Sequence, residues 1–452
     1  MGKLFGTDGI RGVVGENLTA DLAFRTGKAI AAVLKEKKGR KPVITIGKDT
    51  RISSDMLESA LIAGICSVGG DVMPFGVLPT PAVAYLTVLK GADAGIVISA
   101  SHNPYEHNGI KVFNEKGYKL PDAIEEQVEE KILTDIYPAA THGEIGVLRH
   151  GLRQSREAYI DHLAGTIESD LSGLRLLVDC SNGASSATAP ELFGRFRCFC
   201  DFIHREPDGV NINDHCGSTH LDDLAQKVVA GGYDIGVAFD GDADRCLLDE
   251  QGGVIDGDKV LAVCGSDMKR RGKLSGGTIV ATVMSNLGLH EFCRENGVGL
   301  VCTSVGDRNV LEKMNECGYK LGGEQSGHII FLDYMPTGDG QLAALQFLDI
   351  LSHSGKKASE LSASVRQYPQ LLQNVRVTSN EQKTAIMQSD SLREAIQKAE
   401  AELGENGRVL IRPSGTEPLI RVMVEAGTEQ QAQAVTQALV QHVENLQKLS
   451  EK

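Results

Sequence analysis

The stretch Asp93-Ala94-Gly95-Ile96-Val97-Ile98-Ser99 decides the fold class, because the chain repeats it as Asp234-Ile235-Gly236-Val237-Ala238-Phe239-Asp240. Both copies fit the pattern D-x-G-[IV]-[VA]-[IF]-[SD], and in each a short apolar run leads into a polar loop. Strands that deliver polar loops at their carboxyl ends are typical of open α/β sheets, which bind ligands at that edge. Short apolar strands also resemble one another by chance, so the match alone leaves both interpretations open. A looser echo lies at residues 317–322.

Outward from these stretches, short β-branched runs alternate with longer amphipathic segments, which favours an α/β fold with mixed or parallel sheets. After about residue 370 the pattern changes to that of a small α+β domain. We expect strands over residues 43–47, 72–75, 95–99, 174–179, 234–239, 278–282, 374–378, 408–411 and 419–424, and helices over 54–69, 390–403 and 430–449. Four domains fit this pattern better than three, with bounds at residues 1–155, 156–256, 257–369 and 370–452.

The amino-acid composition excludes several classes of function. Lysine and arginine number 46 against 60 aspartates and glutamates, a net charge of −14. Such a chain repels phosphate backbones, so we expect no nucleic-acid partner, although a small anionic substrate is compatible with locally gathered basic residues. No apolar run approaches the roughly 20 residues that cross a bilayer, and the start lacks a signal-peptide core, so we expect a cytoplasmic protein without membrane contact. The ten cysteines form no Cys-x-x-Cys pair, so the usual zinc spacings are absent and most should be buried free thiols.

Three carboxylates alternate with small residues in Asp240-Gly241-Asp242-Ala243-Asp244. In a tight loop, alternate side chains can converge on one hard cation, and Mg²⁺ prefers such oxygen ligands. An EF-hand fits poorly, because Arg245 and Gln251 stand where that loop needs Gly and Glu. A solvated acidic turn is the alternative. The metal site is favoured, because adjacent unpaired carboxylates repel one another and need a counter-charge.

A hydroxyl stands at the tip of a predicted strand in Ser99-Ala100-Ser101-His102-Asn103-Pro104. Pro104 cannot continue a strand ladder, so the loop should project from the sheet. Ser101 beside His102 could be a nucleophile or a phosphate carrier, or only a capping serine in a turn. Lys111 could return to the same site, or be an exposed surface lysine.

Three further stretches are rich in polar groups. Arg412-Pro413-Ser414-Gly415-Thr416 combines a guanidinium, two hydroxyls and a glycine, as a site for an oxyanion would. Glu324-Gln325-Ser326-Gly327-His328 offers donors and acceptors that suit sugar hydroxyls, and residues 5–12 place Arg11 in a Gly-rich turn. The alternatives are a turn between strands, a polar loop and an N-terminal hairpin.

Together and in this order, the five motifs closely resemble those of the α-D-phosphohexomutases, over essentially all 452 residues. Residues 5–12 resemble the N-terminal motif of that family, 99–104 its phosphoserine loop, 240–245 its magnesium loop, 323–328 its sugar loop and 412–418 its phosphate loop. Gln325 points to the branch that acts on glucosamine phosphates, because phosphoglucomutase/phosphomannomutase relatives typically carry Met there. The opening Phe-Gly-Thr-Asp-Gly-Ile-Arg-Gly supports the same branch.

The resemblance implies four domains around a central cleft: three similar mixed-sheet α/β/α domains and a small α+β C-terminal domain. It implies interconversion of glucosamine 6-phosphate and glucosamine 1-phosphate, a step toward UDP-N-acetylglucosamine and peptidoglycan. The reaction would pass through phosphoserine at Ser101 and a 1,6-bisphosphate. The resemblance also implies one Mg²⁺ per subunit, glucosamine or glucose 1,6-bisphosphate as activator, and an amino-sugar phosphate as the small-molecule partner. A homodimer is the candidate assembly.

The resemblance assigns roles residue by residue. Lys111 is the candidate proton-transfer group, and Arg11, His102 and Arg245 would lie near the transferring phosphate. Ser101, Asp240, Asp242 and Asp244 would hold the metal. Substrate binding would fall to Glu324, Ser326 and Asp307 for the sugar, and to Arg412, Ser414, Gly415 and Thr416 for the phosphate that does not react.

Two other functions remain open. A phosphoglucomutase/phosphomannomutase would differ in its rates on glucosamine, glucose and mannose phosphates. A metal-dependent sugar phosphatase would use Asp240 as nucleophile and release inorganic phosphate. A non-catalytic sugar-phosphate-binding protein is more remote, because it needs neither a phosphoserine nor three clustered carboxylates.

Overall fold

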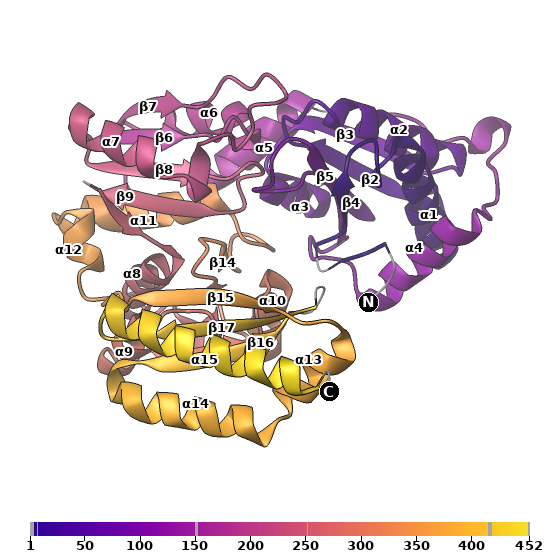
Figure 1. Ribbon diagram of the computed structural model, residues 1–452. Coiled ribbons are helices and arrows are strands. Elements are labelled where there is room, and N and C mark those ends of the chain that lie inside the picture. The colour runs from indigo at the N-terminus through magenta and orange to yellow at the C-terminus, as the bar shows by residue number, and fades with distance from the viewer. Residues whose placement is uncertain (1–3, 7, 150–151, 251, 415–417, 451–452) are drawn as a thin grey trace. The chain divides into compact units, whose positions relative to one another are not determined.

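A computed structural model describes residues 4–6, 8–149, 152–250, 252–414 and 418–450, which form helices around four sheets (Figure 1). The chain separates into two compact units. The first comprises Met1–Met284 and Val298–Ala363, and the second comprises Ser285–Gly297 and Ser364–Lys452. In the part of the chain that is described, no helix is both long and apolar enough to cross a membrane.

The first sheet has the strand order β1-β5-β4-β2-β3. Strands β2, β3 and β4 are parallel, and β5 and β1 are antiparallel to their neighbours. Helices α1 and α2 contribute to an aliphatic core on this sheet, which is the main source of its stability. The elements are β1 (Ile10–Val13), α1 (Ala20–Lys38), β2 (Val43–Lys48), α2 (Ser54–Ser67), β3 (Asp71–Val77), α3 (Thr80–Leu89), β4 (Ala94–Ile98), β5 (His107–Asn114), α4 (Asp122–Thr134) and the following α5 (Leu152–Ala164).

The second sheet has the order β10-β9-β8-β6-β7 and therefore repeats the first sheet place for place. Strand β6 corresponds to β2, β7 to β3, β8 to β4 and β9 to β5, with the same parallel and antiparallel pairs. Its elements are β6 (Arg175–Asp179), α6 (Ala189–Phe193), β7 (Phe199–Ile203), α7 (Asp222–Gly231), β8 (Ile235–Phe239), β9 (Cys246–Glu250) and β10 (Gly253–Ile255).

The third sheet, β12-β11-β13-β14, shows the same order without the edge strand. Its strands and the helices of this region in the first unit are α8 (Gly257–Arg270), β11 (Thr278–Thr282), β12 (Gly299–Thr303), α10 (Asp307–Cys317), β13 (Leu321–Gly323), β14 (Ile329–Phe331), α11 (Gly340–Ser354) and α12 (Ala358–Ser362). The intervening α9 (Leu287–Glu295) belongs to the second unit.

The first aspartate of the repeated stretch makes the same hydrogen bond in the first two sheets. Asp93 accepts a 2.9 Å hydrogen bond from the Val43 amide where β2 begins, and Asp234 accepts a 2.7 Å bond from the Arg175 amide where β6 begins. Each aspartate thus fixes the start of the neighbouring parallel strand. The sequence match reflects a repeated structure rather than chance.

The glycine of the repeat is required by helix packing in all three sheets. A Cβ at Gly95 would lie 2.2 Å from a Thr87 side-chain atom on α3, and one at Gly236 would lie 2.8 Å from Val228 on α7. Gly322 in β13 takes the same place, 2.7 Å from Met314 on α10. The loose echo at residues 317–322 therefore leads into the third copy of this strand.

The second unit contains the antiparallel sheet β15-β17-β16. An aliphatic core joins this sheet to its helices. Its remaining elements are β15 (Gln370–Arg376), α13 (Asn380–Met387), α14 (Asp390–Leu403), β16 (Arg408–Pro413), β17 (Leu419–Glu425) and α15 (Glu429–Ser450).

The predicted fold class, three similar α/β/α domains and a final α+β domain, is confirmed by these sheets. Most predicted elements lie within about two residues of the observed bounds, the usual scatter at element ends. The prediction of a strand at 374–378 is wrong by four residues at its start, since β15 spans Gln370–Arg376. Mostly exposed side chains line this edge strand, so no apolar alternation marks where it begins.

Candidate active site

The Ser101 hydroxyl lies where the loops after β4 and β8 meet, at the carboxyl ends of the two matched strands. It donates a 2.5 Å hydrogen bond to Asp240 Oδ2. Ser101 is buried and its backbone is left-handed, with φ at 52°. That conformation is uncommon for serine, so surrounding contacts must hold the loop in place.

Two residues outside the predicted motifs hold the Ser101 loop in this conformation. Arg51 Nη2 donates to the backbone carbonyls of Asn103 at 2.5 Å and Ser101 at 3.2 Å. Asn213, from the second sheet, donates through Nδ2 to the same two carbonyls at 3.0 and 2.9 Å. Asp49 pairs with the Arg51 guanidinium and keeps it in position. The Ser101 loop is therefore fixed from both sheets.

The three predicted metal ligands, Asp240, Asp242 and Asp244, converge. One carboxylate oxygen from each lies within 4.8 Å of the others, and the residue between the last two, Ala243, is left-handed (φ 57°). Oδ1 of Asp242 and Oδ1 of Asp244 are buried and make no hydrogen bond to any described residue. Buried carboxylate oxygens without a donor need a cation, so this group fits Mg²⁺.

The charges of this group are unevenly balanced. Burial, together with the charges of Asp244 and Asp242, raises the pKa of Asp240 to about 8. The pKa of Asp244 is instead held below its ordinary value. Burial alone would raise this pKa, but Lys111, His328 and Arg245 outweigh burial. The metal-free cluster thus keeps one carboxyl protonated, whereas a divalent cation would favour its ionised form.

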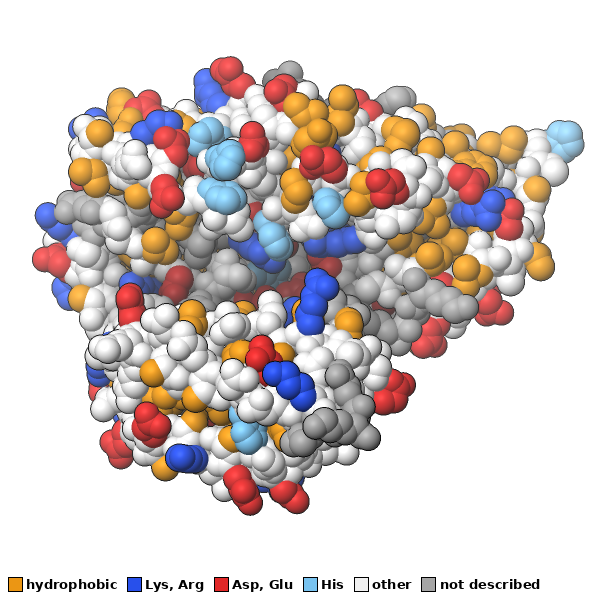
Figure 2. All heavy atoms as spheres, in the orientation of Figure 1, with side chains coloured by type: hydrophobic (Ala, Val, Ile, Leu, Met, Phe, Trp, Pro, Cys, Tyr) orange, Lys and Arg blue, Asp and Glu red, His pale blue; other side chains and the backbone are white. Residues whose placement is uncertain are grey.

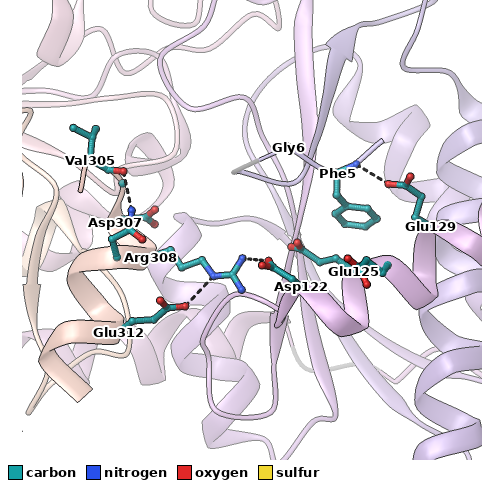
Figure 3. Close-up of a pocket in the computed structure, with 12 residues that line it drawn as sticks. Phe5, Gly6, Asp122, Glu125, Glu129, Val305, Asp307, Arg308 and Glu312 are labelled. Carbon is teal, nitrogen blue, oxygen red and sulfur yellow. Dashed lines mark hydrogen bonds and ion pairs between the residues drawn. The ribbon is translucent and has the colours of Figure 1, made fainter. Parts of the chain in front are cut away.

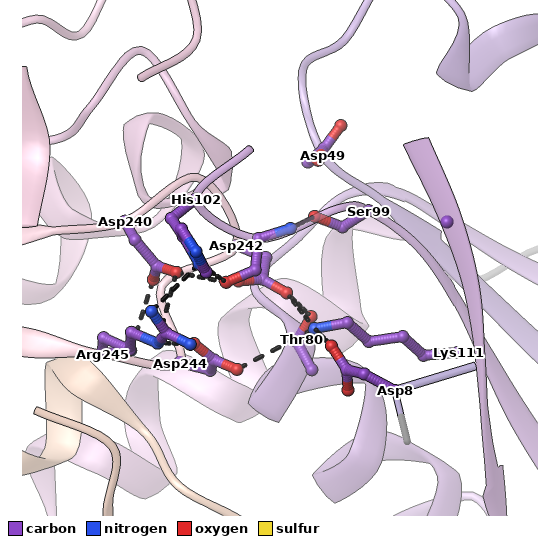
Figure 4. A network of polar contacts seen from close by, with 12 residues as sticks. Asp8, Asp49, Thr80, Ser99, His102, Lys111, Asp240, Asp242, Asp244 and Arg245 are labelled. Atoms are coloured by element: carbon purple, nitrogen blue, oxygen red, sulfur yellow. Dashed lines mark hydrogen bonds and ion pairs between the residues drawn. The ribbon is translucent and has the colours of Figure 1, made fainter. Parts of the chain in front are cut away.

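Lys111 reaches this cluster from β5. Its Nζ lies 2.8 Å from Asp242 Oδ2, 3.5 Å from Asp8 Oδ2 and 3.9 Å from Asp244 Oδ2 (Figure 4). Burial alone would lower the Lys111 pKa, but these three carboxylates outweigh it and raise the pKa. Lys111 is an ammonium here, so it can donate a proton before it can accept one. Asp8 also pairs with Arg11, which brings the N-terminal motif to the same place.

Arg245 and His102 lie beside Asp240. Arg245 Nη1 lies 3.0 Å from His102 Nδ1, and the Arg245 amide donates to Asp240 Oδ1 at 3.3 Å. Burial, then the charges of Arg245 and Arg11, lowers the pKa of His102 to about 4. His102 is therefore neutral at physiological pH and accepts from Arg245, which orients that guanidinium.

The predicted sugar loop adjoins the metal loop through His328. His328 Nδ1 lies 3.6 Å from Asp244 Oδ2, and its Nε2 lies 3.9 Å from Asp307 Oδ2. Asp307 also pairs with Lys119, whose Nζ lies 2.8 Å from Asp8 Oδ1. One chain of charged side chains therefore links the first, second and third sheets.

The sugar loop itself presents different groups to its surroundings. Glu324 Oε1 accepts a 3.0 Å hydrogen bond from the Gly306 amide, next to Asp307. Ser326 is exposed, and Gln325 Nε2 lies 3.4 Å from Asp256 Oδ2 at the start of α8. The loop thus carries a hydrogen-bonded carboxylate at Glu324 and an exposed hydroxyl at Ser326.

A cavity of about 370 Å³ opens beside Asp307, between α4 and the start of α10 (Figure 3). Arg308 crosses it to donate a 2.5 Å hydrogen bond to Asp122 Oδ1 on α4. Its walls carry mostly acidic side chains, including Glu125, Glu129 and Glu312. Ser101 and the three clustered carboxylates do not line this cavity.

Comparison with known proteins agrees with this arrangement. Profiles of the phosphoglucomutase/phosphomannomutase family match in order: alpha/beta/alpha domain I at residues 2–138, domain II at 157–253, domain III at 256–368 and the C-terminal domain at 372–442. The chain is 52% identical to the phosphoglucosamine mutase of Desulforudis audaxviator, over 98% of each chain. It is also 52% identical to that of Acetivibrio thermocellus, over 94% of this chain and 95% of the relative.

The chain belongs to the phosphoglucosamine mutase family. Among solved structures, a phosphoglucomutase/phosphomannomutase family protein from Burkholderia thailandensis superposes with a TM-score of 0.81 at 25% identity, over 98% of this chain and 97% of the other. The family resemblance predicted from the five motifs is confirmed.

The phosphate loop of this phosphoglucosamine mutase family member lies in the second unit. Arg412 on β16 pairs in register with Arg421 on β17, and Nε of each is buried without a hydrogen bond to a described residue. Burial and the charge of Arg421 lower the pKa of Arg412. Two adjacent guanidiniums without a described carboxylate partner are chemically suited to an anion. Arg421 gave no sequence signal, because it lies outside the quoted motif.

The other predicted residues of this loop are described only in part. Ser414 is buried, and its carbonyl accepts a 2.7 Å hydrogen bond from Lys383 Nζ on α13. Gly415 and Thr416 lie outside the described residues. Within the first unit, the structure gathers Ser101, His102, Lys111, Arg11 and Arg245 around the three carboxylates, with Glu324, Ser326 and Asp307 on the adjoining loops.

Proposed function

We propose that this chain interconverts glucosamine 6-phosphate and glucosamine 1-phosphate, with Ser101 carrying the exchanged phosphoryl group. The observation that supports this most directly is the Ser101 hydroxyl, buried 2.5 Å from one member of a three-carboxylate cluster. About half-identical phosphoglucosamine mutases, matched over nearly the full length, favour the glucosamine phosphates over glucose and mannose phosphates.

Asp240, Asp242 and Asp244 would hold one Mg²⁺ per subunit, with a phosphoserine oxygen on Ser101 completing the set. The two orphaned buried oxygens support this assignment. When bound, Mg²⁺ supplies positive charge that offsets the charge on the oxygens of the transferring group. Thr80, which donates to Asp242 Oδ2 at 2.6 Å, orients that carboxylate.

The first step breaks the Oγ–P bond of phosphoserine and forms a bond from phosphorus to the free sugar hydroxyl, whose proton goes to a base. Its products are free Ser101 and the 1,6-bisphosphate. In the return step the serine hydroxyl attacks the other phosphate, so Ser101 regains a phosphoryl group and none is consumed. Added glucosamine or glucose 1,6-bisphosphate activates the enzyme by transferring a phosphoryl group to unmodified Ser101.

Lys111 moves the proton in this scheme. As an ammonium 2.8 Å from Asp242, it is ready to donate to the oxygen that leaves phosphorus. After donating it can accept the hydroxyl proton of the next transfer. Arg245 and Arg11 add positive charge near the reacting phosphate, and His102 holds the Arg245 guanidinium by accepting from it.

The sugar and the distant phosphate are held by other loops. Glu324 and Ser326 bind sugar hydroxyls in either orientation of the intermediate, and Asp307 lies next to them. The phosphate that does not react binds Arg412, Ser414, Gly415 and Thr416, with Arg421 beside them.

Phosphorus NMR with glucosamine 6-phosphate, Mg²⁺ and catalytic glucose 1,6-bisphosphate tests the proposal, because the 1-phosphate, the 6-phosphate and inorganic phosphate give separate signals. Appearance of the 1-phosphate without inorganic phosphate supports a mutase. Steady release of inorganic phosphate would instead favour the phosphatase alternative. Faster turnover of glucose or mannose phosphates would favour a phosphoglucomutase/phosphomannomutase.

The assembly and the location complete the proposal. A homodimer is the expected assembly, which sedimentation velocity of the full chain tests. The cytoplasm is the expected location, which fractionation of the source cells tests.

A further inference from the structure

A second cluster of metal-ligating side chains lies away from Ser101, at the carboxyl edge of the second sheet. Asp179 is the last residue of β6, and His204 directly follows β7. Cys216 precedes the turn that begins at Gly217. The three belong to separate loops, so no sequence spacing reveals them.

Three kinds of ligand atom converge in this cluster. A carboxylate oxygen of Asp179, a ring nitrogen of His204 and the sulfur of Cys216 lie within 4.8 Å of one another. His204 Nδ1 is buried and lies 3.0 Å from Asp179 Oδ2. Asp179 and Cys216 are fully buried.

The outer contacts of the cluster match those of a metal site. His204 Nε2 lies 3.4 Å from Asp223 Oδ2, and Asp223 is paired with Lys227 at 2.6 Å. Histidines that bind metals usually present their other ring nitrogen to a carboxylate in this way, which fixes the ring and its tautomer.

The Asp179 carboxylate is positioned in advance. It accepts from the Ser181 amide through Oδ1 at 2.7 Å and from the Gly217 amide through Oδ2 at 2.9 Å. Gly217 is left-handed (φ 75°), and a Cβ there would lie 2.4 Å from Ser181 Oγ, so the turn needs glycine. The backbone thus presents the carboxylate without relying on flexible side chains.

We propose that Asp179, His204 and Cys216 bind a second metal ion, a divalent transition ion of the zinc class. Oxygen, imidazole nitrogen and thiolate sulfur together suit Zn²⁺ or Co²⁺, whereas Mg²⁺ takes oxygen ligands. Metal–ligand distances of about 2.0–2.3 Å put ligand atoms roughly 3.3–3.7 Å apart in a tetrahedron. The separations in the cluster, at most 4.8 Å, exceed that range by no more than about 1.5 Å. Binding forms an S–metal bond and releases the thiol proton of Cys216 to solvent.

The position of the cluster assigns the ion a supporting role. Cys216 closes the loop that contains Asn213, and Asn213 donates to the carbonyls of Ser101 and Asn103. Asn213 is also tied to Ser181, two residues after Asp179, by a 2.7 Å hydrogen bond from Ser181 Oγ. The ion would thus brace the loop that holds the Ser101 segment, without contacting the sugar phosphate. Histidine side chains gather on one part of the molecular surface (Figure 2). The exposed His215 and His220, which precede and follow Cys216 in the chain, have rings in contact with each other.

The competing explanation is that His204 is an imidazolium between the Asp179 and Asp223 carboxylates, with Cys216 a spectator thiol. The two explanations differ in whether the sulfur becomes a metal ligand. A thiolate–cobalt charge-transfer band in the near ultraviolet reports that bond, and an all-oxygen site does not give it.

The test is titration of the full chain with Co²⁺ in excess Mg²⁺, under reducing conditions. We expect the charge-transfer band to saturate at one Co²⁺ per chain, and the melting temperature to rise as Co²⁺ binds the folded chain. C216S and H204N should lose both signals. Asn suits position 204 because the backbone there is left-handed (φ 46°), a conformation that Asn tolerates. D242N, in the Mg²⁺ cluster, and C317S, at an exposed thiol, should keep the band.

Absence of the band in the unaltered chain, or a band that survives in C216S, would overturn the second site. If C216S does not fold, H204N decides alone, because His204 is partly exposed and its replacement removes one ligand from the edge of the cluster. Mutase activity is not the readout, so failure here leaves the proposed function untouched.

Discussion

Ser101 Oγ lies 2.5 Å from Asp240 Oδ2, and the two residues follow matched strands of two repeated sheets. The duplicated stretch that reveals the fold thus also brings the proposed phosphate carrier and the first of the proposed metal ligands to one point. A phosphoryl group on Ser101 would stand against three carboxylates. Such an arrangement is stable only with a cation between them, so modification and metal binding should depend on each other.

Replacing Ser101 with Ala should abolish turnover, because no other described hydroxyl occupies the same contact with Asp240. We expect kcat to fall by at least about a thousandfold, consistent with removal of a covalent intermediate. Intact mass should lose the phosphoryl adduct after incubation with glucose 1,6-bisphosphate. Ser172→Ala, at an exposed serine before β6, is the control and should keep both activity and adduct. Substantial turnover by the Ser101 variant would exclude this serine as the carrier.

Asp242→Asn should weaken Mg²⁺ binding at least about tenfold, because it neutralises one anionic ligand of a hard cation. Thr80→Val is the matched variant, since it removes only the 2.6 Å hydrogen bond to the same carboxylate. It should shift the affinity by a few-fold, the usual value of one neutral donor. Calorimetric titration with Mg²⁺ measures both. Equal effects would mean that Asp242 acts through its hydrogen bond rather than as a ligand.

Mg²⁺ binding should release a proton below about pH 8. In the metal-free chain, burial and the neighbouring carboxylates raise the pKa of Asp240 to about 8, so this carboxyl is protonated at neutral pH. The cation favours the ionised form, hence the apparent affinity should fall as pH drops below 8, by up to about tenfold per unit. Calorimetry in buffers of different ionisation enthalpy counts the protons. The release should disappear in Asp240→Asn; its persistence there would assign the proton to another group.

Asn213→Gly should lower kcat about tenfold with little change in KM, because two donors to the Ser101 loop are lost while the sugar contacts remain. Glycine preserves the left-handed backbone of this position (φ 58°), so the change is confined to the side chain. His215→Gly is the matched control, since His215 is also left-handed (φ 51°) but its side chain is 90% exposed. A KM effect in place of a kcat effect would contradict the positioning role.

The repeat and the local motifs could be predicted from the sequence because each consists of residues adjacent in the chain. Asp93 and Asp234 carry the same signal and make the same hydrogen bond. The residues that it missed act across sheets: Asn213 donates to the carbonyl of Ser101, 112 positions away. Asp8 and His328 lay within quoted motifs, but no rule of spacing indicated that they would join Lys111 and Asp244. Residues that are brought into contact only by tertiary packing cannot be recognised from the local sequence pattern.

Arg412 and Arg421 lie side by side on β16 and β17, and their buried Nε atoms make no hydrogen bond to a described residue. Each charge disfavours the other in the absence of an anion, and Arg421 lowers the pKa of Arg412. Arg412→Ala should therefore leave the melting temperature unchanged or raise it, while kcat/KM falls. A charge-assisted phosphate contact is worth about 1.5–3 kcal/mol, so we expect a loss of roughly ten- to a hundredfold.

Arg412→Lys should restore only part of this loss, because a point charge cannot reproduce the planar guanidinium fork. The alanine variant should also release more free 1,6-bisphosphate per turnover, since the intermediate is held less well while it reorients. Steady-state kinetics, thermal denaturation and phosphorus NMR measure the three effects. Arg393→Ala, at an exposed arginine of α14, is the control. If Arg412→Ala loses stability in step with activity, the arginine pair supports the sheet rather than the phosphate, and the phosphate site must lie elsewhere in this unit.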